Sequence, residues 1–394
     1  MNQPPNFNHS RIASIDFLRG IVMLLMALDH TRDYFHYGAF IFDPLDLSQT
    51  NSALFLTRFI THYCAPVFVF LAGTSAFLVG QRRSRKSLSI WLLKRGIWLV
   101  IVEITIIKLA WFFDLDFSWL ALQVIWVLGI SMIFLAGFIH IPKKIMIPLA
   151  LIGMLIHNAF DGLEFSGTPG IWWSFLHVQS MVTVSNINIF IAYPAIPWIF
   201  VMALGYHFGS LYKPSTEVSY RYKFLTRTGI GMLLLYLILR IPNLYGDMNH
   251  WNVQDDFMFT MLSFINVTKY PPSLLYLLIT LGPSLLLLAA AERWSGKIYD
   301  RIVIVGRVPM FYYIIHIYII HGLATLAAVL SGYSASEMIF NGWGPDPGNL
   351  EGYGYNLLVV YLVWIGIILG MYPICRWYYG YKRKNRDQWW LSYL

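Results

Sequence analysis

Residues 272–292 read PSLLYLLITLGPSLLLLAAAE, an apolar run that contains no charged side chain before Glu292. An α-helix needs about 20 such residues to cross the roughly 30 Å of hydrocarbon in a bilayer. The stretch therefore predicts a membrane-spanning helix, and similar runs recur along the chain on both sides of it. The ten predicted spans, including this one, cover residues 14–36, 53–80, 88–112, 118–139, 143–160, 188–211, 222–240, 272–292, 305–331 and 355–379.

The composition of the whole chain agrees with this pattern. Of the 394 residues, 57% are hydrophobic and 12% are charged, and the mean hydropathy is +0.57. Soluble domains carry about a quarter charged residues. The composition excludes an ordinary soluble enzyme, a disordered protein and a nucleic-acid module, so we expect no nucleic-acid partner. We predict an all-α fold, a polytopic transmembrane helix bundle that forms a single domain over residues 1–394 and has the lipid bilayer as its partner.

Two further apolar stretches are too short to cross a bilayer. They cover residues 171–182 and 256–266, and we interpret them as interfacial or re-entrant segments. If one of them did span, the number of helices would be eleven.

The basic residues indicate an orientation. The net charge is +8, with 28 Lys and Arg against 20 Asp and Glu. Most of the basic residues fall in alternate loops and in the C-terminal tail, whereas the opposite loops hold most of the acidic ones. Because Lys and Arg collect on the cytoplasmic side of membrane proteins, both termini are predicted to be cytoplasmic. The alternation would break if one helix were gained or lost, which favours ten spans over eleven.

The first predicted span carries a group of ionisable residues at its outer end. Asp29, Arg32, Asp33 and His36 follow the i, i+3, i+4, i+7 spacing and share one helix face, and His30 lies about 100° round the helix from Asp29. Ionisable residues within a bilayer are costly and are functional candidates by default. The alternative is a solvated continuation of the helix beyond the lipid, in which both carboxylates pair with Arg32.

The second and ninth spans add further polar residues. Arg58 and His62 are spaced i, i+4 at the same predicted depth, so His62 could face Asp29 or Asp33. Anchoring at the membrane interface is the alternative for Arg58. His316 lies in the middle of the ninth span, where a histidine is more often satisfied by a backbone partner than catalytic.

Several common catalytic motifs are absent. The sequence contains no G-x-x-x-x-G-K-[ST], G-x-S-x-G, H-E-x-x-H or C-x-x-C motif, so the readings as an ATPase, a serine hydrolase, a zincin or a thiol oxidoreductase lose support, and we expect no metal. What remains is histidine beside carboxylate, the combination for general acid–base catalysis near neutral pH.

Five short motifs resemble the heparan-α-glucosaminide N-acetyltransferase-like family of membrane acyltransferases, in particular its bacterial members. They are RIASIDFLRG at residues 11–20, CAPVFVFLAG at 64–73, YPAIPW at 193–198, KYPPS at 269–273 and VGRVPM at 305–310. The resemblance implies acetyl transfer from cytoplasmic acetyl-CoA to the amine or hydroxyl of a sugar or glycan on the outer side, in the inner membrane of a bacterium. It also implies a catalytic histidine in the segment after the first family helix and an asparagine near the end of that helix. His36 and His30 occupy these two positions here, so the sequence departs from the family at the asparagine.

Together these observations assign roles to named residues. His36 and His30 are equally ranked candidates for the general base and His62 is third; Asp29 or Asp33 would orient the imidazole. Arg32, Arg58 and His316 are candidates for acceptor binding. Arg19, Arg95 and Arg307, on the predicted cytoplasmic side, are candidates for binding the phosphates of CoA.

Other functions compete with acyl transfer. One is a proton-coupled transporter of a sugar or an organic anion, which would use the same carboxylates and histidines as a proton relay. The second is a non-catalytic assembly or lipid-flipping partner. Whether the chain acts alone or as a homodimer also stays open.

Overall fold

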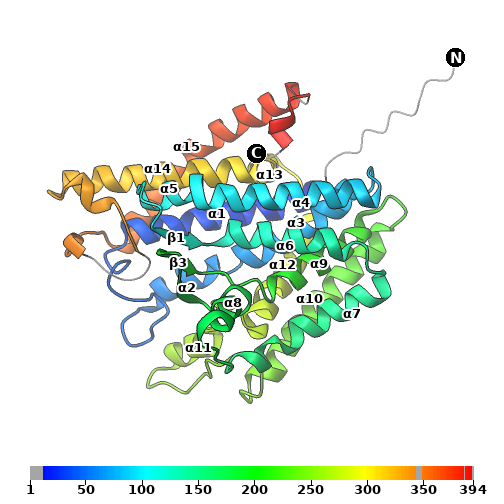
Figure 1. Ribbon diagram of the computed structural model, residues 1–394, viewed down its shortest axis with the longest axis horizontal. Helices are drawn as coiled ribbons and strands as arrows, with labels where there is room; N and C mark the ends of the chain where they lie inside the picture. Colours follow the sequence, from blue (N-terminus) through cyan, green and yellow to red (C-terminus); the bar gives the residue numbers. More distant parts are fainter. Residues whose placement is uncertain (1–11, 343–347, 386, 393–394) are drawn as a thin grey trace.

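The structure is a computed structural model that describes residues 12–342, 348–385 and 387–392. It is mostly helical, and the long helices lie alongside one another in a bundle (Figure 1). Short helices and a small sheet gather toward one end of this bundle, which in Figure 1 is the left side. Arg11, the first residue of the RIASIDFLRG motif, is outside the described residues.

The helices are α1 (Ala13–Phe35), α2 (Ser52–Thr61), α3 (Cys64–Gly80), α4 (Arg85–Val102), α5 (Lys108–Phe112), α6 (Val124–Phe138), α7 (Lys143–Ile156), α8 (Gly167–Leu176), α9 (Trp198–Phe208), α10 (Val218–Arg240), α11 (Phe257–Ile265), α12 (Leu274–Ala291), α13 (Lys297–Gly306), α14 (Pro309–Leu330) and α15 (Leu357–Lys384). A π-helical segment, Glu103–Ile107, joins α4 to α5. Short 3₁₀ turns cover His157–Phe160, Gly209–Tyr212, Ala335–Met338, Gly348–Leu350 and Trp389–Ser392. The strands are β1 (Trp119–Leu122), β2 (Ser180–Val184) and β3 (Ile187–Ile191).

Six helices within the described part of the chain are long and apolar enough to cross a membrane. They are Ser52–Gly80, in which α2 and α3 follow one another, Lys143–Phe160, Val218–Arg240, Leu274–Ala291, Pro309–Leu330 and Leu357–Lys384. Each coincides with a predicted span. Helix α1 has the length of a span, with 23 residues, but carries several charges. That the chain crosses the membrane ten times and that both termini are cytoplasmic stay predictions.

A small sheet replaces helix at two places where helical spans were predicted. The spans predicted at 118–139 and 188–211 begin instead with β1 and β3, so the helical prediction is wrong there. The strand order is β1-β3-β2, with β1 parallel and β2 antiparallel to β3. Ser185 and Asn186, both in the left-handed region, form the two-residue turn of the hairpin between β2 and β3. A short apolar run does not distinguish strand from buried helix, and the strand pairing that decides it is not local.

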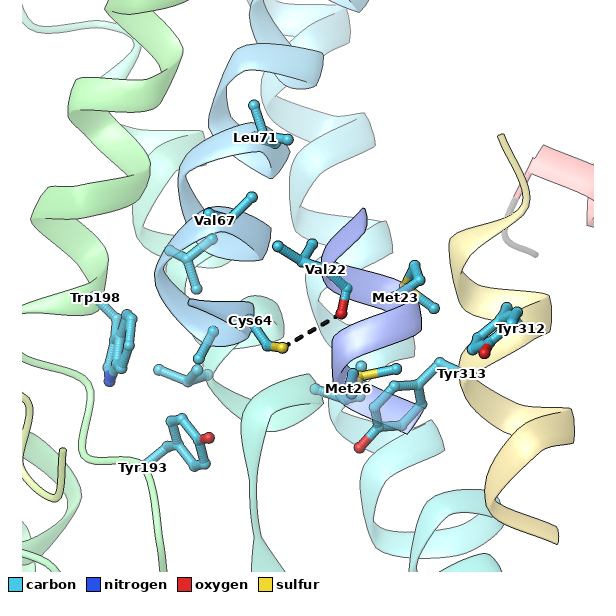
Figure 2. Packing of buried hydrophobic residues seen from close by; sticks show 14 of the residues in the cluster. Val22, Met23, Met26, Cys64, Val67, Leu71, Tyr193, Trp198, Tyr312 and Tyr313 are labelled. Atoms are coloured by element: carbon cyan, nitrogen blue, oxygen red, sulfur yellow. Dashed lines mark hydrogen bonds between the residues drawn. The ribbon is translucent and has the colours of Figure 1, made fainter. Parts of the chain in front are cut away.

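Helix α1 is central and packs against α2, α3, α12, α13, α14 and α15. Figure 2 shows part of this core, where Val22 and Met26 of α1 lie between α3 and Tyr313 of α14. The Sγ atom of Cys64 donates to the carbonyl of Val22 at 3.3 Å, which fixes the first turn of α3 against α1.

Glycine permits the closest approach of α1 to α13. A Cβ atom on Gly306 would lie 1.8 Å from the carbonyl oxygen of Asp16, and one on Gly20 would lie 2.2 Å from that of Ile302. Small residues let helix backbones come close together within membranes.

Candidate functional site

Asp29 is the centre of a buried group of charges. The Nη1 atom of Arg58 in α2 donates to both of its carboxylate oxygens, at 2.9 and 2.7 Å, and Nη2 of Arg32 lies 2.9 Å from its Oδ1. The same Nη2 of Arg32 also pairs with Asp33. We call Asp29, Arg32, Asp33 and Arg58 the Asp29 cluster.

The burial of these residues distinguishes a polar site from a solvated helix end. Arg32 does pair with both carboxylates, but Asp29 and Arg32 are only 9% and 4% exposed, so this end of α1 is not a solvated continuation of the helix. Arg58 is not an interfacial anchor either, because its guanidinium is committed to Asp29. A carboxylate held by two guanidinium groups is typical of a built polar site.

His30 and His316 form a second pair beside this cluster. Nδ1 of His30 lies 2.8 Å from Nε2 of His316, and the two rings are stacked. Nδ1 of His316 in turn lies 2.8 Å from the carbonyl oxygen of Tyr312. The rings of Trp111 and Tyr313 meet the His30 ring edge-on, with centroids 4.6 and 6.2 Å away. The sequence named both histidines as candidates but did not predict that they touch.

His36 lies apart from this pair. It is the C-cap residue of α1, and its Nδ1 atom accepts a hydrogen bond from the backbone N–H of Gly38 at 3.1 Å. Its ring lies against that of Tyr37. One nitrogen of His36 is thus engaged in local structure.

His62 lies where the second predicted span is interrupted between α2 and α3. Pro66 has no N–H to offer the carbonyl of His62, four residues earlier, and that carbonyl accepts instead from the Tyr276 hydroxyl at 2.8 Å. The His62 ring is 1% exposed, and neither of its nitrogens has a hydrogen-bond partner among the residues that the structure describes. His62 does not pair with Asp29 or Asp33, because the partner from α2 is Arg58.

The structure adds residues to which the sequence assigned no role. Lys269, in the loop between α11 and α12, is buried and interacts electrostatically with Asp29, His30 and His62. The hydroxyl of Tyr270, beside it, lies 3.4 Å from that of Tyr193. The signal for these residues was present, because KYPPS and YPAIPW were two of the motifs that resemble the family.

Polar contacts hold the loop that carries Lys269. Asp247 accepts hydrogen bonds from the backbone N–H and hydroxyl of Thr268 and from the hydroxyl of Ser273, at 2.7 to 2.8 Å. The guanidinium of Arg240 donates to backbone carbonyls at the C-terminal end of α11, a helix end where carbonyls lack helical partners. Hydrogen bonds to Asp247 and from Arg240 therefore fix the position of the segment that carries Lys269.

A second charged group lies near the other end of α1. Asp16 accepts from Nη1 of Arg19 at 2.9 Å and from Nε of Arg307 at 3.3 Å. Arg19 also donates to the carbonyl of Gly306 and to Ser75, and Arg307 donates to the Tyr379 hydroxyl. Two of the three arginines predicted for CoA thus share one carboxylate, and we call Asp16, Arg19 and Arg307 the Asp16 cluster.

Arg95, the third of these arginines, lies on α4 with its guanidinium 5.5 Å from the ring centre of Trp91. Trp91 also lines an open hollow of about 450 Å³ at the start of α4, together with Arg83, Lys86 and Lys94. The hollow is basic and accessible, so it offers a second place for an anion on the predicted cytoplasmic side.

A comparison with models of known protein families identifies the family of this chain. Residues 11–241 match the family model described as Heparan-alpha-glucosaminide N-acetyltransferase, catalytic. The match spans more than half of the 394 residues. The chain belongs to this family. No curated protein matches the chain.

Membership in this acetyltransferase family confirms the resemblance that the five motifs indicated, and the apolar helices agree with an integral membrane acetyltransferase. The matched region contains the Asp29 cluster, His30, His62 and Tyr193, whereas Lys269, Arg307 and His316 lie beyond its end at residue 241. The part of the chain after residue 241 therefore contributes residues that lie beside those of the matched region.

Proposed function

We propose that the protein transfers an acetyl group from cytoplasmic acetyl-CoA to the amine or hydroxyl of a sugar on the opposite side of the bilayer, with His30 as the general base. The observation that carries this proposal is the hydrogen-bonded pair of His30 and His316 next to the Asp29 cluster. His36 and His62 lack such an arrangement.

Hydrogen positions follow from the partners. A carbonyl oxygen only accepts, so Nδ1 of His316 carries the proton that it shares with Tyr312. In a neutral ring Nε2 of His316 is then an acceptor, and Nδ1 of His30 must donate to it. This assignment leaves the lone pair of His30 on Nε2, ready to take a proton.

In the proposed step, the acetyl group passes directly from the sulfur of CoA to the acceptor atom. The nitrogen or oxygen of the acceptor attacks the thioester carbonyl, and its proton passes to Nε2 of His30. The new C–N or C–O bond forms as the C–S bond breaks, and the CoA thiolate takes the proton from His30, which returns to its neutral form. The imidazolium of His30 is stabilised by the neighbouring carboxylate of Asp29 and by the acceptor nitrogen of His316.

The Asp16 cluster supports a donor site at the cytoplasmic end. The Asp16 cluster places two guanidinium groups beside one carboxylate, and guanidinium groups are suited to bind the phosphates of CoA. Arg95 and the basic hollow at the start of α4 add further positive charge on the predicted cytoplasmic side. Acetyl-CoA is the donor substrate in this proposal, and Arg19, Arg95 and Arg307 are its proposed contacts.

The test is acetyl transfer by purified protein in detergent, with radiolabelled acetyl-CoA and glucosamine as the acceptor. Because a positioned general base contributes roughly 10²- to 10⁴-fold in rate, His30→Gln is expected to lose about that much turnover. His140→Gln is the matched control, since His140 is exposed. A protein that imports sugar into vesicles and neither transfers nor hydrolyses acetyl-CoA would favour the transporter instead.

A further inference from the structure

We propose that Arg32, His62 and Lys269 form an anion subsite, which recognises a carboxylate, phosphate or sulfate group carried by the acetyl acceptor. The inference rests on the proposed function and specifies the chemical class of its acceptor. It follows from side-chain nitrogens of Arg32 and His62 that have no partner in the described structure, and from the buried ammonium of Lys269, whose hydrogen-bond partner is the uncharged side chain of Tyr270.

The buried charges around Asp29 do not balance. Arg32, Arg58 and Lys269 contribute three positive charges, while Asp29 and Asp33 contribute two negative ones. A third carboxylate, that of Asp43, also interacts with Arg58, but Asp43 is exposed. Lys269 is 8% exposed, and within residues 12–342, 348–385 and 387–392 no carboxylate lies within 4 Å of its ammonium group. A buried ammonium without a counter-ion is costly, and an anionic ligand would supply the missing charge.

Hydrogen-bonding capacity is unused at the same place. Nη1 of Arg32 and both ring nitrogens of His62 are buried and have no partner in the part of the chain that the structure describes. Nη1 of Arg32 and the ring nitrogen of His62 that carries the proton are donors, and buried donors cost free energy unless they are satisfied. An oxyanion carries several lone pairs and can accept from a guanidinium, an imidazole and an ammonium at once.

These donors belong to one region of the molecule. Lys269 and Arg32 both interact electrostatically with Asp29, His30 and His62. A continuous series of aromatic contacts, with ring centres 5.2 to 6.5 Å apart, also joins His62 to Tyr270, whose ring centre lies 5.0 Å from the Lys269 ammonium. The series runs through Tyr276, Trp198 and Tyr193. Figure 2 shows the last two of these near Cys64, at the start of α3.

The subsite lies next to the proposed base. Asp29 and His30 are consecutive in α1, and Asp29 is held by Arg32 and Arg58. An acceptor anchored through its anion at Lys269 would therefore lie beside His30. This arrangement makes the anion a determinant of which amines or hydroxyls are acetylated.

The first experiment compares matched acceptors on the wild-type protein. Glucosamine 6-phosphate and glucosamine 6-sulfate each carry the anion that glucosamine lacks. A charge-assisted hydrogen bond is worth about 10- to 100-fold, so kcat/KM for the anionic acceptors should exceed that for glucosamine by about this factor. Inorganic phosphate should compete with the anionic acceptors. Equal kcat/KM values for all three acceptors, without competition by phosphate, would overturn the proposal.

The second experiment assigns the effect to Lys269. Lys269→Met keeps the length of the side chain without its charge and should reduce the ratio of kcat/KM between anionic and neutral acceptors, whereas Lys269→Arg should retain part of it. Lys144→Met, at an exposed position, is the control and should leave the ratio unchanged. An unchanged ratio in Lys269→Met would contradict the proposal. If Lys269→Met does not fold, the wild-type comparison and the phosphate competition decide.

A binding measurement separates this proposal from the proposed function. Glucosamine 6-phosphate without any donor should raise the melting temperature of the wild-type protein, and glucosamine should not. If that stabilisation occurs but no acetyl transfer is found, the subsite stands and the acetyltransferase mechanism fails. If CoA alone gives the stabilisation that depends on Lys269, the anion belongs to the donor and the proposal is overturned.

Discussion

Nδ1 of His30 lies 2.8 Å from Nε2 of His316, although 286 residues separate the two histidines in sequence. Helix α14 therefore supplies the acceptor that sets the tautomer of a ring on α1. The second nitrogen of His316 is occupied by the backbone of its own helix, at Tyr312. His316 is thus a positioning residue in the proposed mechanism, and its effect on the reaction passes through His30.

We expect His316→Ala to lower kcat by less than His30→Gln, because His30 keeps its basic nitrogen but loses the partner that fixes its tautomer. His316→Gln, whose side-chain oxygen can still accept from His30, should recover part of the loss. Acetyl transfer by the purified variants measures both effects. Full activity in His316→Ala would show that the contact is only structural.

His36→Ala should retain more turnover than His30→Gln. The reason is that Nδ1 of His36 accepts from Gly38 and the ring does not belong to the His30–His316 pair. Steady-state kinetics of the two variants, with melting temperatures to check folding, decide between them. Loss of turnover confined to His36→Ala would transfer the role of base to that residue.

The pair of Asp29 and Arg58 should matter for stability. Arg58→Met leaves the carboxylate of Asp29 with only Arg32, and breaking a buried ion pair from one side typically costs roughly 3–5 kcal/mol. The double variant Asp29→Asn, Arg58→Met should regain part of this loss, since it leaves fewer unpaired charges. Denaturant unfolding in detergent gives these values. Arg85→Met, at an exposed position, is the control and should change stability by no more than about 0.5 kcal/mol.

Gly306→Ala should separate α1 from α13. The added Cβ atom would lie 1.8 Å from the carbonyl oxygen of Asp16, and overpacking of this kind costs about 1–3 kcal/mol. Gly322→Ala is the matched control in α14, where nothing lies within 4 Å of the added atom. Alanine there should be neutral or stabilise the helix by up to about 1 kcal/mol. Equal melting temperatures for the two variants would contradict the close contact.

The topology is tested with reporters whose activity depends on the side of the membrane. A cytoplasmic reporter fused after Leu394, which is outside the described residues, should be active. A reporter inserted near Asn341 should be active only on the outer side. An exchange of these results at either site would contradict the map of ten spans and the predicted orientation.

Local composition was sufficient to predict the parts of the fold that depend on lipid contact. Runs such as 272–292 must cover about 30 Å of hydrocarbon, so length and apolar content alone predict a helix there, and α12 spans Leu274–Ala291. The same holds for the polar face of α1, because the spacing of Asp29, Arg32 and Asp33 follows from helix geometry. Arg58 was predicted at the same depth as this face, but whether it anchored the membrane interface or joined the site depended on burial.

Contacts between distant segments were decided only by the tertiary structure. The pairing of His30 with His316, the electrostatic interaction of Lys269 with Asp29 and the pairing of β1 with β3 each join parts of the chain that no local pattern relates. Their physical cause is the packing of helices around α1, which determines the residues that share a buried volume. The sequence by itself therefore determined a membrane acetyltransferase family and the residue types available for catalysis. The arrangement of these residues, with His30 against His316 and unpartnered donors around Asp29, came from the fold, because a polar group is functional or merely satisfied according to the partners that packing brings to it.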